Sequence, residues 1–415
     1  MLDRPAVRSA RAMKRYLVPT ILALAIVSAC HREETPAAER ISRVSRGTGP
    51  LVIGAPWPWE ARKDLAYGKG LDLAVEEVNG SGGIKGRPIR IQREDDHESA
   101  DEGRRVAQKL TLNPDVVAVI GHLQSYISVP ASAVYELGDL VMICPASTDP
   151  LLTSQGYHRI FRATFTDEDV GRAVAELASA RNLKRTAIYY IRNNYGRGLA
   201  NAFEERASQL GIEIIDRQSY DPNGHGTDAG VEIVAKRWQQ QELQAVFIAA
   251  EPDQGARFIK ELRLAGVKAQ VFGGDALGTP ELLRLGGAAV EGTISVAPFH
   301  ADEKRPEVEK FREAFKKHYG GEPDAGAALA YDAVWLLARA MRIAKVPAGE
   351  SLADALRTAP EWTGVTGAFA FDSTGNRRTQ HLVTTVVRSG RFEQLADVPV
   401  GRNVLAQRAV VPGGQ

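Results

Sequence analysis

His122 and Ser125 lie close together in the chain, and a histidine beside a serine could supply a base and a nucleophile. Such pairs in loops are far more often satisfied polar groups than parts of a triad, and the chain has no Gly-x-Ser-x-Gly elbow. It also lacks the glycine-rich phosphate-binding motifs, and its histidines lack metal-ligand spacing. We therefore expect binding rather than catalysis, with no cofactor and no metal.

Polar residues gather in five loops, and each loop follows an apolar run. In open parallel sheets ligands lie outside the carboxyl ends of the strands, where loops present backbone N–H groups and short polar side chains. The sequence therefore predicts that one cleft is lined by five segments: 121–128, 145–149, 193–198, 251–253 and 273–278.

The elements that position these loops alternate apolar runs with amphipathic stretches, which is typical of βα units on a parallel sheet. One series begins at Leu51 and a second near Thr166, and two helical patterns and two strand candidates follow them. The predicted fold class is α/β, with two doubly wound parallel-sheet lobes and a ligand cleft between them.

Composition argues against a polyanionic partner. The chain has 415 residues, 44% hydrophobic and 25% charged, with a formal net charge of +1. This balance is typical of globular proteins and lacks the positive field that nucleic acid requires, so nucleic acid is excluded as a partner. Cys144 lies in an apolar run and is expected to be a buried structural thiol.

The N-terminus predicts export and a lipid anchor. Basic residues precede an apolar run from Leu17 to Ala29, which is too short to span a bilayer and reads as a signal peptide over residues 1–29. The run ends Val27-Ser28-Ala29-Cys30, which resembles a lipobox, so Cys30 is the expected lipidation site. The translation start is left open between Met1 and Met13. Residues 30–50 are expected to form a flexible tether.

Several motifs in the loops carry a resemblance to a known family. They include Val119-Ile120-Gly121-His122-Leu123-Gln124-Ser125, Thr148-Asp149-Pro150, Tyr195-Gly196, Gly273-Gly274-Asp275 and Tyr331-Asp332-Ala333. In this order and spacing the chain resembles the leucine/isoleucine/valine-binding proteins, the type I periplasmic solute-binding proteins of ABC importers. The resemblance implies three crossovers, near Thr166, Val296 and Phe371. Lobe 1 is then 51–166 plus 297–370, and lobe 2 is 167–296 plus 371–412.

The resemblance also implies roles for individual residues. Ser125 and Thr148 would hold a ligand carboxylate, and the Ala146 carbonyl and Asp275 would receive its ammonium group. Hydroxyls and helix N-termini suit an anion without adding a charge of their own. Tyr195 would close over the ligand from the second lobe, and Tyr331 would face it from the first.

Departures from the family pattern fall mainly at the end of the site that meets the ligand side chain. Glu98 and Gln124 stand where family members often carry a disulfide, and Lys63 and Ala250 stand near the positions of pocket aromatics. A bulky segment, Pro56-Trp57-Pro58-Trp59-Glu60, replaces a small first loop. We expect Trp57 or Trp59 to contribute to the rebuilt pocket. For Asp275, the alternative role is a helix N-cap before Leu277.

The sequence thus predicts an extracytoplasmic receptor, anchored to the membrane through Cys30, that delivers a branched-chain-amino-acid-like compound to the permease and ATPase subunits of an ABC importer. A ligand sensor of the same fold, such as an amide-responsive regulator, is the first alternative. An exported hydrolase is the second. The identity of the ligand and the choice between inner and outer membrane stay open.

Overall fold

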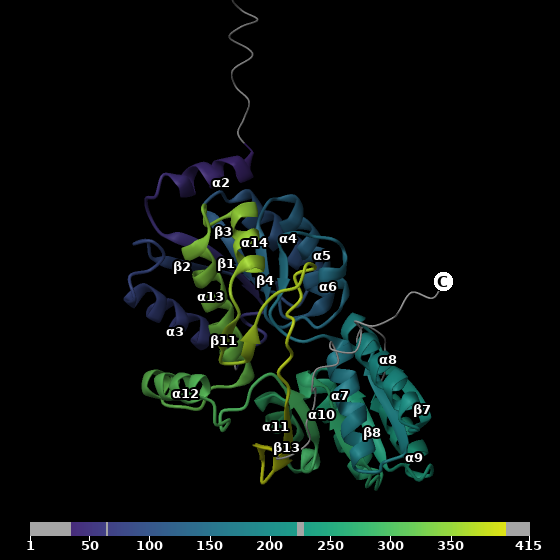
Figure 1. The fold of residues 1–415 in the computed structure, drawn as a ribbon. Helices are drawn as coiled ribbons and strands as arrows, with labels where there is room; N and C mark the ends of the chain where they lie inside the picture. Colours follow the sequence, from purple (N-terminus) through teal and green to yellow (C-terminus); the bar gives the residue numbers. More distant parts are fainter. Residues whose placement is uncertain (1–34, 64, 222–227, 396–415) are drawn as a thin grey trace, which may run out of the picture.

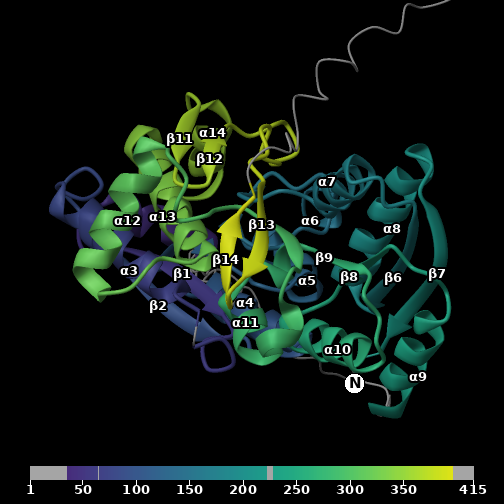
Figure 2. The same ribbon diagram turned by 90° about the horizontal axis from the view of Figure 1, so that it is seen from below.

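A computed structural model describes residues 35–63, 65–221 and 228–395. Cys30, the predicted signal peptide and the end of the predicted second lobe, 396–412, lie outside the described residues. In Figure 1 the first lobe lies above the second, and Figure 2 shows the lobes side by side. None of the described helices is both long and apolar enough to cross a membrane.

The first lobe is built on a five-stranded parallel sheet of order β2-β1-β3-β4-β5. Strands β1, β3 and β4 are buried along their whole length because helices cover both faces of the sheet. The strands are β1 Leu51–Trp57, β2 Ile89–Asp95, β3 Val116–Ile120, β4 Val141–Cys144 and β5 Ile160–Arg162. The helices and a small hairpin are α3 Tyr67–Gly80, α4 Ala100–Leu112, α5 Ser125–Leu137, α6 Leu151–Ser154, α12 Pro306–Tyr319, α13 Ala325–Ile343, α14 Gly349–Thr358, β11 Trp362–Gly364 and β12 Gly367–Phe369.

The second lobe has a seven-stranded sheet of order β14-β13-β10-β9-β8-β6-β7. Five strands are parallel, and β13 and β14 add an antiparallel edge. The strands are β6 Arg185–Ile191, β7 Glu213–Tyr220, β8 Ala245–Ala249, β9 Gln270–Gly273, β10 Ile294–Ala297, β13 Val383–Arg388 and β14 Arg391–Gln394. The helices are α7 Asp167–Ala180, α8 Asn194–Gln209, α9 Asp228–Gln239, α10 Pro252–Leu264 and α11 Pro280–Gly286, with 3-10 turns η1 Asp275–Leu277 and η2 Gly287–Val290. The predicted fold class is confirmed.

The third crossing between the lobes lies later than predicted. Phe371 belongs to the buried core of the first lobe, and Asn376 pairs with Arg162 of β5. The Arg377 guanidinium donates to the carbonyl oxygens of Ala163, at 3.2 Å, and Thr366, at 2.6 Å, which holds this segment on the first lobe. The chain therefore leaves the first lobe after Arg377 and not at Phe371.

The predicted tether is wrong over residues 36–45, because Pro36–Ser45 forms helix α2 on the first lobe. Figure 1 shows α2 at the end of this lobe that is remote from the second lobe. Arg40 is fully buried and donates to the carbonyl oxygens of Val116 (2.6 Å), Thr111 (2.7 Å) and Gly138 (3.0 Å). Thr111 and Gly138 end α4 and α5, where helix carbonyls lack partners of their own, so one buried guanidinium satisfies both helix ends.

Candidate ligand-binding site

A cavity lies between the lobes at the carboxyl ends of their strands. Its empty space is about 900 Å³ when open solvent at the mouth is included. All five predicted loops contribute to its wall, through Ser125 and its neighbours, Ala146, Thr148, Tyr195, Glu251 and Asp275.

Two hydroxyl residues of the first lobe line one part of the cavity. Ser125 is the first residue of α5, and its hydroxyl accepts a hydrogen bond from the Asp149 N–H at 3.4 Å. Gln124 gives this helix no side-chain cap, and its carbonyl oxygen accepts the Ile127 N–H, so the Ser125 and Tyr126 N–H groups can serve a ligand. Thr148 and Ala146 follow β4 in the same wall. This part of the cavity offers hydrogen-bond donors for an anionic group.

The second lobe places a carboxylate in the cavity wall. The Tyr195 hydroxyl donates to Asp275 Oδ1 at 3.0 Å, which fixes the carboxylate. Burial raises the pKa of Asp275 to about 6, although the Tyr195 hydrogen bond lowers it. Gly274, and not Asp275, caps η1, so the alternative N-cap role for Asp275 is wrong.

The two glycines before Asp275 serve packing within the lobe. A Cβ on Gly274 would lie 2.5 Å from Leu199 Cδ2 and 2.8 Å from the Tyr195 hydroxyl oxygen. A Cβ on Gly273 would lie 2.7 Å from Leu277 Cβ. Glycine here lets the backbone approach Tyr195 and its neighbours, which sets the position of Asp275.

Glu251 is a cavity residue that the sequence did not single out. It follows β8, lines the wall and is partly buried. Burial raises the pKa of Glu251 to about 7, while the Arg62 guanidinium at 3.9 Å lowers it. The sequence did contain a signal for Glu251, because this acid follows the buried strand β8 just as Asp275 follows β9.

The remaining wall is largely apolar. Trp57 lies in it and stacks on Tyr67, with ring centroids 3.6 Å apart and planes 3° apart. Leu65, Leu123 and Leu329 lie in the same wall. Trp57 Nε1 is buried and has no hydrogen-bond partner among the described residues.

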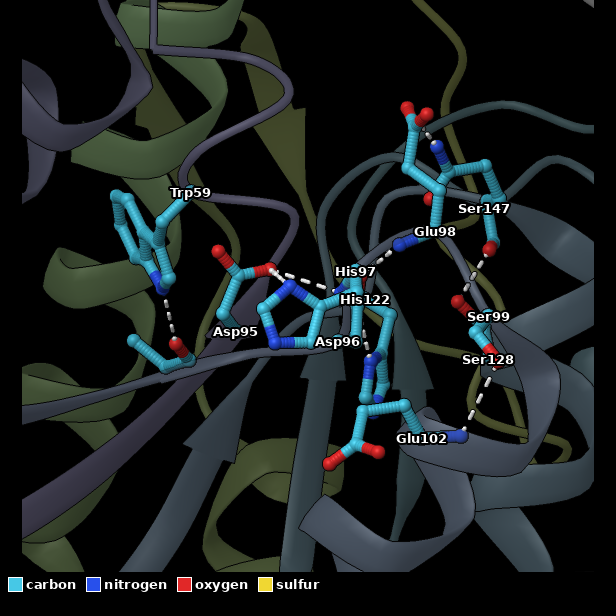
Figure 3. Close-up of polar contacts among 12 residues, drawn as sticks. Trp59, Asp95, Asp96, His97, Glu98, Ser99, Glu102, His122, Ser128 and Ser147 are labelled. Atoms are coloured by element: carbon cyan, nitrogen blue, oxygen red, sulfur yellow. Dashed lines mark hydrogen bonds and ion pairs between the residues drawn. The ribbon is translucent and has the colours of Figure 1, made fainter.

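Trp59 does not line the cavity. Its ring packs under the Arg93 guanidinium, at 4.8 Å, and its Nε1 donates to the Ala55 carbonyl at 3.0 Å, as Figure 3 shows. These contacts hold the segment after β1 on the first lobe. Of the two tryptophans, therefore, only Trp57 reaches the site.

Tyr331 is also absent from the cavity wall, which corrects the role implied by the family resemblance. It lies on α13 within the core of the first lobe, where its hydroxyl donates to Glu77 Oε2 at 2.5 Å. The part of α13 that does reach the cavity is its first turns, at Ala325, Gly326 and Leu329.

A hydrogen bond stands where family members often carry a disulfide. Gln124 Nε2 donates to Glu98 Oε1 at 2.8 Å, so the same two loops are joined without sulfur. Cys144 is a free, buried thiol, as expected.

His122 takes no part in a triad with Ser125. Its ring is fully buried, with Nδ1 2.7 Å from Asp96 Oδ2 and Nε2 3.1 Å from the Tyr135 hydroxyl. Figure 3 shows the His122–Asp96 contact beside the loop that carries Glu98. Within the described part of the chain no cluster of histidine, cysteine and acidic residues could hold a metal ion.

Comparison with known proteins agrees with this architecture. The leucine/isoleucine/valine-binding protein homolog 1 of Brucella suis is 30% identical over 312 residues, which cover 74% of this chain and 81% of that protein. An ABC transporter substrate-binding protein from Desulfitobacterium hafniense, solved in complex with Leu, is 34% identical. It has a TM-score of 0.76, with coverage of 83% of this chain and 100% of that one.

A third protein is LivJ from Streptococcus pneumoniae, a branched-chain amino acid transporter substrate-binding protein solved in complex with isoleucine. It is 25% identical with a TM-score of 0.76, and 83% of this chain aligns with 98% of that one. These relatives are binding proteins by name, and this chain is likewise a binding protein. Since the periplasmic binding protein family matches residues 64–391, most of the chain, the protein belongs to that family.

Proposed function

We propose that this protein is the extracytoplasmic receptor of an ABC importer and that its ligand is a small α-amino acid with a largely apolar side chain. The charge of the cavity carries this proposal. Among the described residues, the cavity wall includes three acids, Glu251, Asp275 and Asp324, and no lysine, arginine or histidine.

Glu251 has a cationic partner, whereas Asp324 and Asp275 both accept backbone N–H groups. Arg62 lies beside Glu251, and Asp324 accepts the backbone N–H groups of Ala66 at 3.0 Å and Ala327 at 2.8 Å. Asp275 has only the neutral Tyr195 hydroxyl among side chains that bond it in the described residues. A ligand ammonium group would supply the missing positive charge, and the donors near Ser125 would receive a carboxylate.

The names of the relatives support the same class of ligand and the same partners. The Desulfitobacterium and Streptococcus proteins were solved with leucine and isoleucine, and both are substrate-binding proteins of transporters. The partners proposed for this chain are the permease and ATPase subunits of an importer. Its proposed location is outside the cytoplasm, with Cys30 as the lipid anchor.

The ligand proposal is tested by calorimetric titration with leucine and two matched analogues. Isocaproate is leucine without its amino group, and isoamylamine is leucine without its carboxylate. We expect leucine to bind and each analogue to bind at least 30-fold more weakly. Isocaproate lacks the ammonium partner of Asp275, a charged pair worth about 2 to 5 kcal/mol. Isoamylamine lacks the carboxylate and so loses several hydrogen bonds to a charged group, each worth about 1.5 to 3 kcal/mol. Isocaproate binding as tightly as leucine would contradict the assignment.

The anchor proposal has its own test. The Cys30→Ser variant, expressed with its signal peptide, should fractionate with soluble proteins, while the wild type should fractionate with membranes. Equal membrane association of the two proteins would contradict the lipid anchor without affecting the ligand proposal.

A further inference from the structure

Arg62 lies on the segment between β1 and α3, beside the mouth of the cavity. This segment is firmly held on the first lobe. The Arg62 N–H donates to the Pro58 carbonyl at 2.8 Å, and the Trp59 indole donates to the Ala55 carbonyl at 3.0 Å. The Glu60 N–H donates to Asp95 Oδ2 at 3.0 Å. The base of the Arg62 side chain is thus fixed before it meets the second lobe.

The Arg62 guanidinium faces three carboxylates from two lobes. Its Nε lies 2.6 Å from Glu98 Oε1 in the first lobe. Its Nη1 lies 2.6 Å from Glu281 Oε2 on α11, and its Nη2 lies 3.9 Å from Glu251 Oε2, both in the second lobe. Only 12% of the Arg62 side chain is exposed, against 19% for Glu281 and 21% for Glu251.

The first lobe orients this guanidinium in advance. Gln124 donates to Glu98 Oε1, the same oxygen that Arg62 contacts, so Glu98 holds Arg62 from a fixed position. The planar fork leaves its Nη atoms directed toward the second lobe. Burial acts to lower the pKa of Arg62, but the charges of Glu251, Glu98 and Glu281 outweigh it and raise the pKa.

The cluster depends on this one cation. Without Arg62, the carboxylates of Glu251 and Glu281 would face Glu98 across the boundary between the lobes, and like charges at this range repel. Arg284 also contacts Glu281, at 3.6 Å, but its side chain is 57% exposed, so solvent screens that pair. A second contact between the lobes, Asn194 Nδ2 to Asp149 Oδ2 at 2.9 Å, carries no charge on its donor.

We propose that Arg62 is an ionic latch, which holds the second lobe closed on the first through Glu281 and Glu251 and so sets how long a ligand stays in the cavity. It is a positioning residue, since it does not line the cavity itself. The part concerning ligand residence rests on the proposed binding function. The part concerning closure does not.

The claim that Arg62 holds the lobes closed is tested by measuring the distance between the lobes without ligand. Leu137 on the first lobe and Leu264 on the second are 90% and 80% exposed, so cysteines there accept a fluorescent donor and acceptor. A Cys30→Ser background removes one competing thiol, and Cys144 is buried. Arg62→Gln should move the distance distribution toward the open form. Lys63→Gln is the matched control, because it makes the same charge change at a side chain that is 67% exposed.

A second variant removes a partner of Arg62 in the second lobe. Glu281→Gln should also favour the open form, and adding it to Arg62→Gln should have much less effect than the two single changes combined. Arg62→Lys should restore closure only in part, because an ammonium group cannot bridge two carboxylates as a planar fork does. An Arg62→Gln distribution identical to the wild type, in a variant with an unchanged melting temperature, would overturn the latch.

Ligand residence is measured with leucine as the probe, by stopped-flow displacement. Arg62→Gln should release leucine about 10- to 100-fold faster, with little change in the association rate, because loss of a partly buried charged pair acts mainly on dissociation. Unchanged release from a variant that binds leucine would overturn this part. If the wild type does not bind leucine, the ligand assignment fails, and the distance measurement still decides the latch.

Discussion

Replacement of Asp275 by asparagine separates the binding role of this residue from its effect on stability. The ionised Asp275 carboxylate lowers the stability of the folded protein, because burial raises its pKa from 3.8 to about 6. Such a rise in pKa corresponds to roughly 3 kcal/mol of folding free energy. Part of Asp275 remains exposed to the cavity, so we discount the effect to about 1 to 3 kcal/mol.

Asp275→Asn should therefore stabilise the protein without ligand by about 1 to 3 kcal/mol at pH 7.5. The sign follows from proton binding. Between about pH 4 and pH 6 the folded Asp275 holds a proton that the unfolded chain has released, so wild-type stability falls as pH rises through this window. The advantage of the variant should be full above pH 6 and should vanish below about pH 4.

The same change should weaken leucine binding by about 30-fold or more, because the ligand ammonium loses its charged partner. Urea unfolding at pH 4 and pH 7.5 measures stability, and calorimetry measures affinity. Asp253→Asn is the matched control, since Asp253 is an exposed acid at the start of α10 in the same lobe. If Asp275→Asn binds leucine normally, the residue does not meet a cation. If it is also no more stable at pH 7.5, burial of the Asp275 carboxylate does not destabilise the folded protein.

Four further predictions concern single features. Leucine affinity should fall as the pH drops below about 6, approaching a tenfold loss per pH unit, since Asp275 must be ionised to bind; titration at constant ionic strength checks this. Tyr331→Phe should leave leucine affinity unchanged and cost about 1 kcal/mol of unfolding free energy, measured in urea. Leucine should change the tryptophan emission of Trp59→Phe but much less that of Trp57→Phe, because only Trp57 lines the cavity. Arg40→Met should speed tryptic cleavage within α2 and lower stability by about 1 to 3 kcal/mol, because buried carbonyls lose their donor.

The sequence predicted the fold and most cavity residues because both depend on local order along the chain. Each polar residue after an apolar run falls at a strand end, and parallel strand ends meet at one edge. Ser125, Thr148 and Asp275 therefore converge in the structure as predicted. Trp57 follows the same rule, as the last residue of β1.

The errors concern contacts between segments far apart in the chain. Tyr331 was assigned by resemblance, but its direction depends on how α13 packs against α3, where Glu77 lies. The segment carrying Arg40 reads as polar and aperiodic, and its order comes from carbonyls some seventy or more residues away. Glu251 needed its distance to Arg62 before its role in the cavity could be argued.

If Cys30 is the lipid anchor, as proposed above, the docking of α2 shortens the chain between that anchor and the folded lobes. Counted to Pro50, a fully extended chain would reach roughly 70 Å, whereas counted to Thr35, where the helix cap begins, it reaches at most about 18 Å. The end of the first lobe that carries α2 would then stay close to the bilayer surface, while the rest of the molecule could rotate about that end. The Arg40 guanidinium, which holds α2 on the first lobe, would then limit the volume that the binding cleft can reach. It would thereby set the local concentration of the cleft at a permease, in place of the length of the linker.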